Sequence, residues 1–204
     1  MPPKQETIII DLTFEVLHRL SRNLSNRWTY HSFEHTADVI AFSELLARAD
    51  NRSEREQSLI KIAAAFHDIG YLIEPANHED LGSELASILM DKSGSYTAEE
   101  CEIVSGMILD TQVFRNGQWD FSSQRNSLSQ YLCDADVSNF GRTSFLDKAE
   151  LVRLEIGAGK TKHYYMHVLE MLDAHFWHSK YANEHLSHQK EMNRKALLEL
   201  IDAL

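Results

Sequence analysis

The chain has 204 residues, with 31 acidic and 20 basic side chains and a formal net charge of −11. This length is sufficient to bury a core without disulfide or metal cross-links, so we expect one domain over residues 1–204. The acidic balance disfavours binding to nucleic acid polymers or anionic membrane surfaces, because both require a basic face. Cys101 and Cys133 are too few for a disulfide framework and fit a reducing, cytoplasmic compartment.

Helices are predicted along most of the chain, because apolar residues recur at three- and four-residue intervals and only eight glycines and three prolines interrupt them. Ser53 with Glu56, and Thr97 with Glu100, have the spacing of capping boxes, which mark helix starts. The sequence therefore predicts an all-α fold. We place helices at roughly residues 11–23, 33–49, 54–68, 79–92, 97–109, 127–139, 144–156, 161–178 and 183–203.

Two segments between the helices have structural interpretations. Asn116-Gly117 is a turn dipeptide flanked by aromatic residues, so residues 113–121 are the one plausible hairpin, and we expect them to form an ordered excursion between helices rather than a sheet. The run Gly157-Ala158-Gly159-Lys160-Thr161 invites comparison with a phosphate-binding P-loop. However, Leu154 stands where that motif needs glycine, and a helix is predicted where it needs a strand. We interpret this run as an interhelical turn.

The C-terminal helices are rich in histidine. His163 and His167 lie four residues apart and could bind a metal together, as could the set His175, His178, His185 and His188. No acidic or cysteine residue completes either site. We therefore expect these histidines on the solvent side of an amphipathic helix pair. The apolar residues expected to pack inward are Leu169, Leu172, Phe176 and Trp177.

Residues capable of chemistry are concentrated in four segments: 30–36, 65–70, 77–82 and 133–139. His67-Asp68 follows an apolar run that must form a core helix. Burying an ionised carboxylate without a partner is costly, and a divalent cation satisfies an adjacent imidazole and carboxylate together. The alternative is a helix end that emerges into solvent, with Gly70 just beyond its C-terminus.

Together these segments resemble the HD superfamily of metal-dependent phosphohydrolases, in which a His, a His-Asp pair and a distant Asp follow one another. The resemblance covers roughly residues 28–156. Tyr30-His31-Ser32-Phe33-Glu34-His35-Thr36-Ala37-Asp38-Val39 and Ala135-Asp136-Val137-Ser138-Asn139 are also similar to segments of cyclic nucleotide phosphodiesterases, with Ser32 and Thr36 departing from that pattern. The resemblance implies His31 as the general acid. The metal ligands that it implies are His35, His67, Asp68 and Asp136.

Further matches concern substrate handling. His78-Glu79-x-x-Gly82 resembles a stretch of many HD proteins and adds His78 and Glu79 to the catalytic candidates, beside His31 and Asp68. Arg153-x-Glu155 is similar to a pattern of small bacterial members and makes Arg153 the candidate for binding substrate phosphate, with Lys160 and Arg142 as alternatives. No segment matches the purine-clamping glutamine of the animal phosphodiesterases, so cyclic-nucleotide specificity does not follow.

These observations predict a single helical HD-type bundle with a metal site between helices, a core at about residues 28–156 and C-terminal helices 161–203 packing on it. The expected function is metal-dependent hydrolysis, as a phosphomonoesterase or phosphodiesterase. The expected substrate is a small phosphorylated molecule, such as a nucleotide or another metabolite. The mixed nitrogen and oxygen ligands suit one or two ions of Mn, Fe, Co, Ni, Zn or Mg. The alternative is a catalytically silent module that binds metal or nucleotide in a regulatory role. A homodimer is left open.

Overall fold

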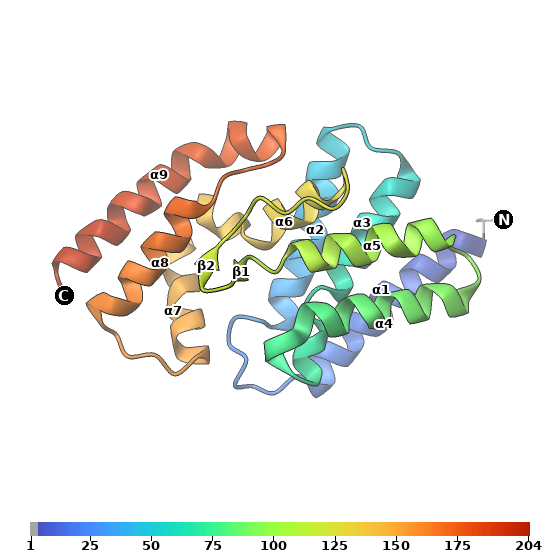
Figure 1. Ribbon diagram of the computed structural model, residues 1–204, viewed down its shortest axis with the longest axis horizontal. Coiled ribbons are helices and arrows are strands. Elements are labelled where there is room, and N and C mark those ends of the chain that lie inside the picture. Colours follow the sequence, from blue (N-terminus) through green and yellow to red (C-terminus); the bar gives the residue numbers. More distant parts are fainter. Residues whose placement is uncertain (1–3) are drawn as a thin grey trace.

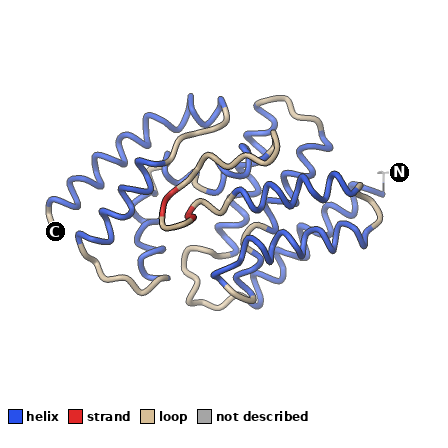
Figure 2. Tube along the Cα trace, viewed as in Figure 1, coloured by secondary structure: helices blue, strands red, loops and turns tan. Residues whose placement is uncertain are grey.

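The computed structural model describes residues 4–204, with side chains from Leu12 onward, and this part of the chain is helical almost throughout (Figures 1 and 2). The all-α prediction is confirmed. The α-helices are α1 (Lys4–Asn23), α2 (Phe33–Ala49), α3 (Glu54–Phe66), α4 (His78–Ser93), α5 (Ala98–Asp110), α6 (Ser129–Asp136), α7 (Phe145–Glu155), α8 (Lys162–Ala174) and α9 (Lys180–Asp202). Short 3-10 segments lie at Ile69–Leu72 (η1), Pro75–Asn77 (η2) and Ser138–Gly141 (η3).

Helix α3 is the centre of the bundle. It packs against α1, α2, α4, α5 and α6, so its apolar residues have no face to present to solvent. Each residue from Leu59 to Phe66 other than Lys61 is at most 4% exposed. Full burial of one such large apolar side chain is worth about 1.5–3 kcal/mol, which makes this helix the main hydrophobic contribution to stability. The His-Asp pair follows directly at its C-terminal end.

The chain after α3 turns where two glycines let helices approach closely. The helix ends at Phe66, two residues earlier than predicted, and continues as η1. A Cβ atom on Gly70 would lie 2.4 Å from the carbonyl oxygen of His78, and one on Gly82 would lie 2.4 Å from that of Phe66. The φ angle of Gly70 does not lie in the left-handed region, so Gly70 does not act as a left-handed helix terminator. Together, Gly70 and Gly82 seat the start of α4 against the His-Asp pair.

Local signals at helix starts and at the hairpin match the structure. Ser53 and Thr97 both form complete capping boxes, at the N-termini of α3 and α5. The excursion at residues 113–121 does contain a hairpin, in which β1 (Phe114–Arg115) pairs antiparallel with β2 (Gln118–Trp119). Asn116 and Gly117 both have positive φ, 52° and 79°, as a tight two-residue hairpin turn requires. Helix α1 begins at Lys4 rather than at residue 11.

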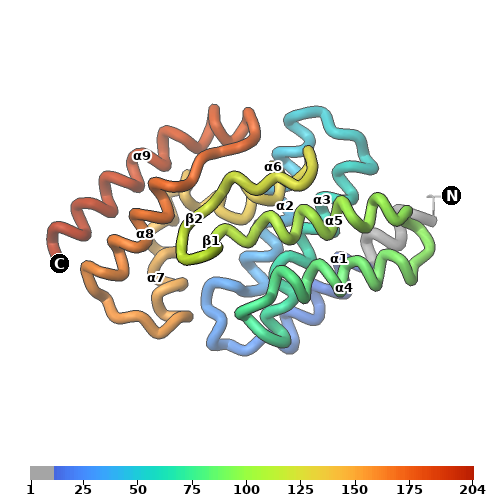
Figure 3. The backbone as a smooth tube through the Cα atoms, in the orientation of Figure 1, coloured from blue at the N-terminus to red at the C-terminus, as the bar shows by residue number. Residues whose placement is uncertain are grey.

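Helices far apart in the sequence are brought together around the site. The colour ramp of Figure 3 shows α6 against α2, and the contacts between their residues confirm that they are neighbours. Helix α9 packs against η3, which follows α6. The side-chain amide of Asn193 donates to the carbonyls of Phe140 and Arg142, at 2.8 and 2.7 Å. These bonds fix the C-terminal helices against the segment that carries Asp136.

One prediction about the C-terminal histidines is wrong. His175 is only 5% exposed and packs against the rings of Phe121, Phe140 and Trp177. Burial, with a contribution from Lys190, lowers the pKa of His175 to about 2, so the ring is neutral near pH 7. Phe176, expected inside, is 50% exposed. The chain leaves α8 at Ala174 in extended conformation, and this break in helical periodicity buries His175 and exposes Phe176, while Trp177 is buried as predicted.

Candidate metal centre

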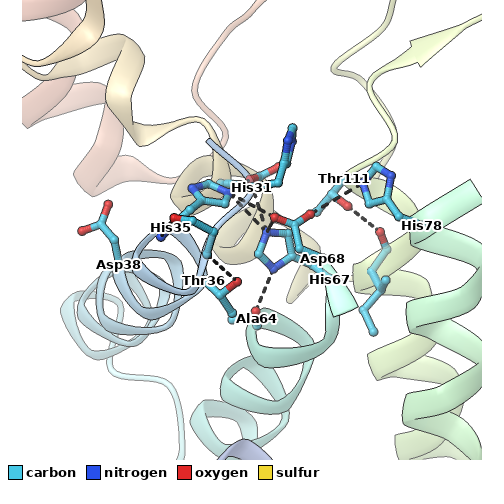
Figure 4. Close-up of polar contacts among 12 residues, drawn as sticks. His31, His35, Thr36, Asp38, Ala64, His67, Asp68, His78 and Thr111 are labelled. Atoms are coloured by element: carbon cyan, nitrogen blue, oxygen red, sulfur yellow. Dashed lines mark hydrogen bonds and ion pairs between the residues drawn. The ribbon is translucent and has the colours of Figure 1, made fainter. Parts of the chain in front are cut away.

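Four potential ligand side chains converge between α2, α3 and α6. Figure 4 shows His35, His67 and Asp68 together, and Asp136 of α6 lies against both histidines. The Nε2 atom of His35 lies 3.1 Å from Oδ1 of Asp136 and 3.5 Å from Oδ2 of Asp68. The Nε2 atom of His67 lies 3.2 Å from Oδ2 of Asp68, 3.5 Å from Oδ1 of Asp136 and 3.4 Å from Nε2 of His35. Two imidazoles and two carboxylates, separated by up to 101 residues along the chain, thus direct one atom each toward a common centre.

Local structure orients these ligands. The Ser32 hydroxyl accepts a hydrogen bond from the backbone N–H of His35 and caps α2, which fixes the first turn that carries this histidine. The carbonyl of Ala64 lies 2.7 Å from Nδ1 of His67 and can only accept, so Nδ1 carries the proton. With the proton on Nδ1, the lone pair of Nε2 is the one available to a metal at the centre, as a metal-binding histidine requires.

The electrostatics of the centre favour a cation. Burial alone would raise the pKa of Asp68, but attraction to His67 and His31 holds that pKa far below its ordinary value. Burial likewise opposes protonation of His67, yet Asp68 and Asp136 raise the pKa of His67 well above its ordinary value. The carboxylates thus stabilise positive charge between the histidines. A proton can supply that charge, and so can a metal ion.

The residues present fit a divalent ion. Oδ2 of Asp68 is buried without a hydrogen-bond donor, which is the kind of orphaned acceptor that an ion satisfies. Ligand atoms bound to one ion at about 2.0–2.2 Å lie about 3–3.5 Å apart, which matches the spacings of the cluster. Ligand atoms of His35, His67 and Asp68 all lie within 4.8 Å of one another, and Asp136 contacts both histidines from the opposite helix. Among the described residues, the C-terminal histidines form no comparable group.

His31 stands beside this cluster with a partner of its own. Its Nδ1 atom is hydrogen-bonded to Oε1 of Glu155, and Oε2 of Glu155 accepts the backbone N–H groups of Tyr30 and His31 at 2.8 and 3.0 Å. The ring of Tyr71 stacks on His31 with 4.2 Å between centroids. Burial opposes protonation of His31, but Asp68 and Glu155 raise its pKa. The raised pKa favours the protonated ring, which is held through Nδ1 and could donate a proton from Nε2.

His78 and Glu79 also lie at the site. The Nδ1 atom of His78 donates to the carbonyl of Pro75 at 2.8 Å, and its Nε2 atom lies 3.6 Å from Oδ1 of Asp68 (Figure 4). Glu79 is 7% exposed, and burial raises its pKa despite the opposing charge of His78. Both side chains line the same cavity as His31, Asp68 and Asp136.

The structure does not bring Arg153 to this cavity. Its Nη1 atom donates to the carbonyl of Ala158 at 2.6 Å and its Nε atom pairs with Glu150 at 3.0 Å, so it closes the C-terminal end of α7. Arg142, one of the alternatives, pairs with Asp38. The functional residue that the sequence reasoning passed over is Glu155. It belongs to the same Arg153-x-Glu155 pattern, but weight was placed on the arginine.

With this geometry established, the comparisons with known proteins identify the family. The family model of the HD domain matches residues 32–139, which is more than half of the chain, so the chain belongs to the HD domain family. Its members are typically metal-dependent phosphohydrolases. No curated protein matches the chain. Within the described residues, no helix combines the length and apolar character needed to cross a membrane.

Two neighbouring aspartates of α6 give a contrast that tests the ligand assignment. Asp134 is fully buried on the far side of the helix and accepts the backbone N–H groups of His178 and Ser179, at 3.0 and 2.7 Å. Asp134→Ala should destabilise the fold by about 2–4 kcal/mol, because it leaves two buried donors without an acceptor, and should leave metal affinity unchanged. Asp136→Ala should lower metal affinity at least about tenfold with little loss of stability.

Chemical denaturation of the two variants measures the change in stability, and metal titration measures the change in metal affinity. The ligand assignment would have to be exchanged if Asp134→Ala lost the metal while Asp136→Ala retained it. Variants that lost stability equally would show that Asp136 is a structural residue as well.

Proposed function

We propose that this protein hydrolyses phosphate esters with a divalent metal held by His35, His67, Asp68 and Asp136. The observation that carries the proposal is that four ligand atoms converge at one end of a cavity whose wall also holds His31, oriented by Glu155. A bare structural cluster would have no need of this second, separately positioned group.

The metal, when bound, supplies a Lewis acid that polarises the phosphoryl group and makes water acidic enough to attack near pH 7. Asp68 lines the cavity and its Oδ1 atom lies 3.6 Å from Nε2 of His78, so its carboxylate could orient a water there and accept a proton from it. His31 can donate a proton to the leaving oxygen, since Glu155 holds its Nδ1 atom and raises its pKa. The carboxylate of Glu155 therefore positions the acid without touching the substrate.

The experiment is a metal and substrate analysis of the purified protein. Elemental analysis should find bound divalent metal, and chelation should abolish hydrolysis of p-nitrophenyl phosphate and bis(p-nitrophenyl) phosphate. Reloading with Mn, Fe, Co, Ni, Zn or Mg in turn should restore it with at least one ion. His35→Ala should lose both metal and activity, whereas His163→Ala, an exposed histidine on α8, should lose neither.

Two results would contradict the proposal. Stoichiometric metal with no hydrolysis of any mono- or diester would indicate a silent metal-binding module. Hydrolysis that survives both chelation and His35→Ala would place the activity outside this centre.

A further inference from the structure

The cavity that begins at the metal centre extends well beyond it. It has a volume of about 440 Å³ and reaches from Asp68 and Asp136 to α7, α8 and the β1-β2 hairpin. This size lies within the range of sites for small organic ligands, about 300–1,000 Å³. Catalytic groups at one end therefore share a continuous space with a second set of walls, which the proposed chemistry does not use.

Those walls are mainly apolar, and the polar side chains among them are Thr111, Gln112, Asn139, Tyr164 and His167. Helices α7 and α8 contribute side chains from both sides, and η3 and the hairpin contribute aromatic rings. The residues that define this end are Phe140, Phe145, Val152, Val168, Phe114 and Trp119. At the hairpin, the ring of Trp119 lies 4.7 Å from that of Phe114 and 5.1 Å from that of His167, so these rings form a compact aromatic edge.

The charges of the cavity are distributed unevenly. The carboxylates of Asp68, Glu79 and Asp136 all lie at the metal end. Of the described residues that line the cavity, none is lysine or arginine. A second phosphate or a carboxylate on the substrate would therefore enter an apolar space without a cation to compensate it, which is strongly unfavourable. An apolar group would instead be stabilised by leaving water.

We infer that the α7-α8 end of the cavity binds the organic group of the substrate, and that the preferred substrates are phosphate esters of apolar alcohols. This inference rests on the proposed function, because it assumes that the phosphate lies at the metal end. It excludes nucleoside polyphosphates and phosphorylated sugars as good substrates, since their organic groups are charged or polar.

The test measures the affinity of alkylphosphonates, whose C–P bond is not an ester linkage, by isothermal titration calorimetry on the Mn-loaded protein. From methyl- to hexylphosphonate, the dissociation constant should fall about two- to fourfold for each added methylene, as expected when each is transferred from water to an apolar wall. 5-Carboxypentylphosphonate, of nearly equal length, should bind at least about tenfold more weakly than hexylphosphonate.

Matched variants locate the effect. Phe114 is 47% exposed and lines the cavity, whereas Phe176 is 50% exposed and does not. Phe114→Ala should weaken hexylphosphonate binding about fivefold and leave methylphosphonate binding unchanged, and Phe176→Ala should change neither. Ile156→Ser and Leu154→Ser form a second pair at the end of α7, where both side chains are exposed and Ile156 alone of the two lines the cavity.

The outcomes separate this inference from the proposed function. The inference would be overturned if the dissociation constant did not change with alkyl length, or if 5-carboxypentylphosphonate bound more tightly than hexylphosphonate. Either result would count even if p-nitrophenyl phosphate is hydrolysed. Equal effects of Phe114→Ala and Phe176→Ala would do the same. If affinity increases with alkyl length but the protein hydrolyses no ester, the apolar site is supported and the proposed function is rejected.

Discussion

Asp68→Asn is expected to lower kcat/KM for phosphate esters on the order of 10³-fold or more and to weaken retention of the metal. The substitution keeps the shape of the side chain but removes the charge that both histidines contact, at 3.2 and 3.5 Å from Oδ2. Asparagine also cannot accept a proton from water. The loss should therefore appear in turnover and in metal stoichiometry together, with the helical circular dichroism spectrum retained.

A second readout of Asp68→Asn needs no metal. Asp68 is the largest influence that raises the pKa of His67 against burial, so this pKa should fall in the metal-free variant, as followed by NMR titration. Asp38→Asn is the matched control, because Asp38 makes the same charge change on the outer face of α2, where it pairs with Arg142. Full activity and metal content in Asp68→Asn would remove this residue from the mechanism.

The sequence predicted those parts of the fold that local chemistry determines. The bounds of α2 were predicted correctly at residues 33–49, and the capping boxes located the starts of α3 and α5 within one residue. The turn of the hairpin was located by Asn116-Gly117 and its aromatic neighbours. In each case the signal lies within a few residues of the feature, so it does not depend on what the segment packs against.

Tertiary contacts decided the parts that the sequence could not predict. Helix α3 ends at Phe66, and beyond it Gly70 and Gly82 allow a close approach of backbone segments that a Cβ atom would block. Periodicity placed His175 on the solvent face because it assumed that α8 continued, whereas the helix ends at Ala174. The local pattern of apolar residues indicates neither of these helix ends.

The candidate site divides in the same way. The four residues that the resemblance implies as ligands do lie together, and spacing alone could not have chosen Asp136 over Asp134 on the same helix. The structure shows why the two differ, since one accepts hydrogen bonds from the start of the α9 segment and the other faces the histidines. Glu155 reaches His31 across 124 residues, which no motif records.

His31→Asn should lower kcat/KM about 10²- to 10⁴-fold for esters with poor leaving groups, such as alkyl phosphates, and much less for p-nitrophenyl phosphate. The reason is that p-nitrophenolate departs without protonation, whereas an alkoxide needs the proton that His31 holds. Metal content should be unchanged, because His31 lies beside the cluster, with its ring centroid 6.0 Å from that of His35. An equal loss on both ester types would assign His31 to substrate positioning and make His78 the next candidate for the acid.

Glu155→Gln isolates the positioning role and gives the sign of the pH effect. The Glu155 carboxylate raises the pKa of His31, so the acid form persists to higher pH than in a free imidazole. Removing the charge lowers this pKa, and the basic limb of the kcat/KM profile for an alkyl phosphate should move to lower pH. Activity at low pH, where His31 is protonated in either protein, should be affected least. The internal control is p-nitrophenyl phosphate, for which Glu155→Gln should leave the basic limb of the pH profile unshifted. If the basic limb is unshifted for the alkyl phosphate as well, Glu155 has no role in proton donation.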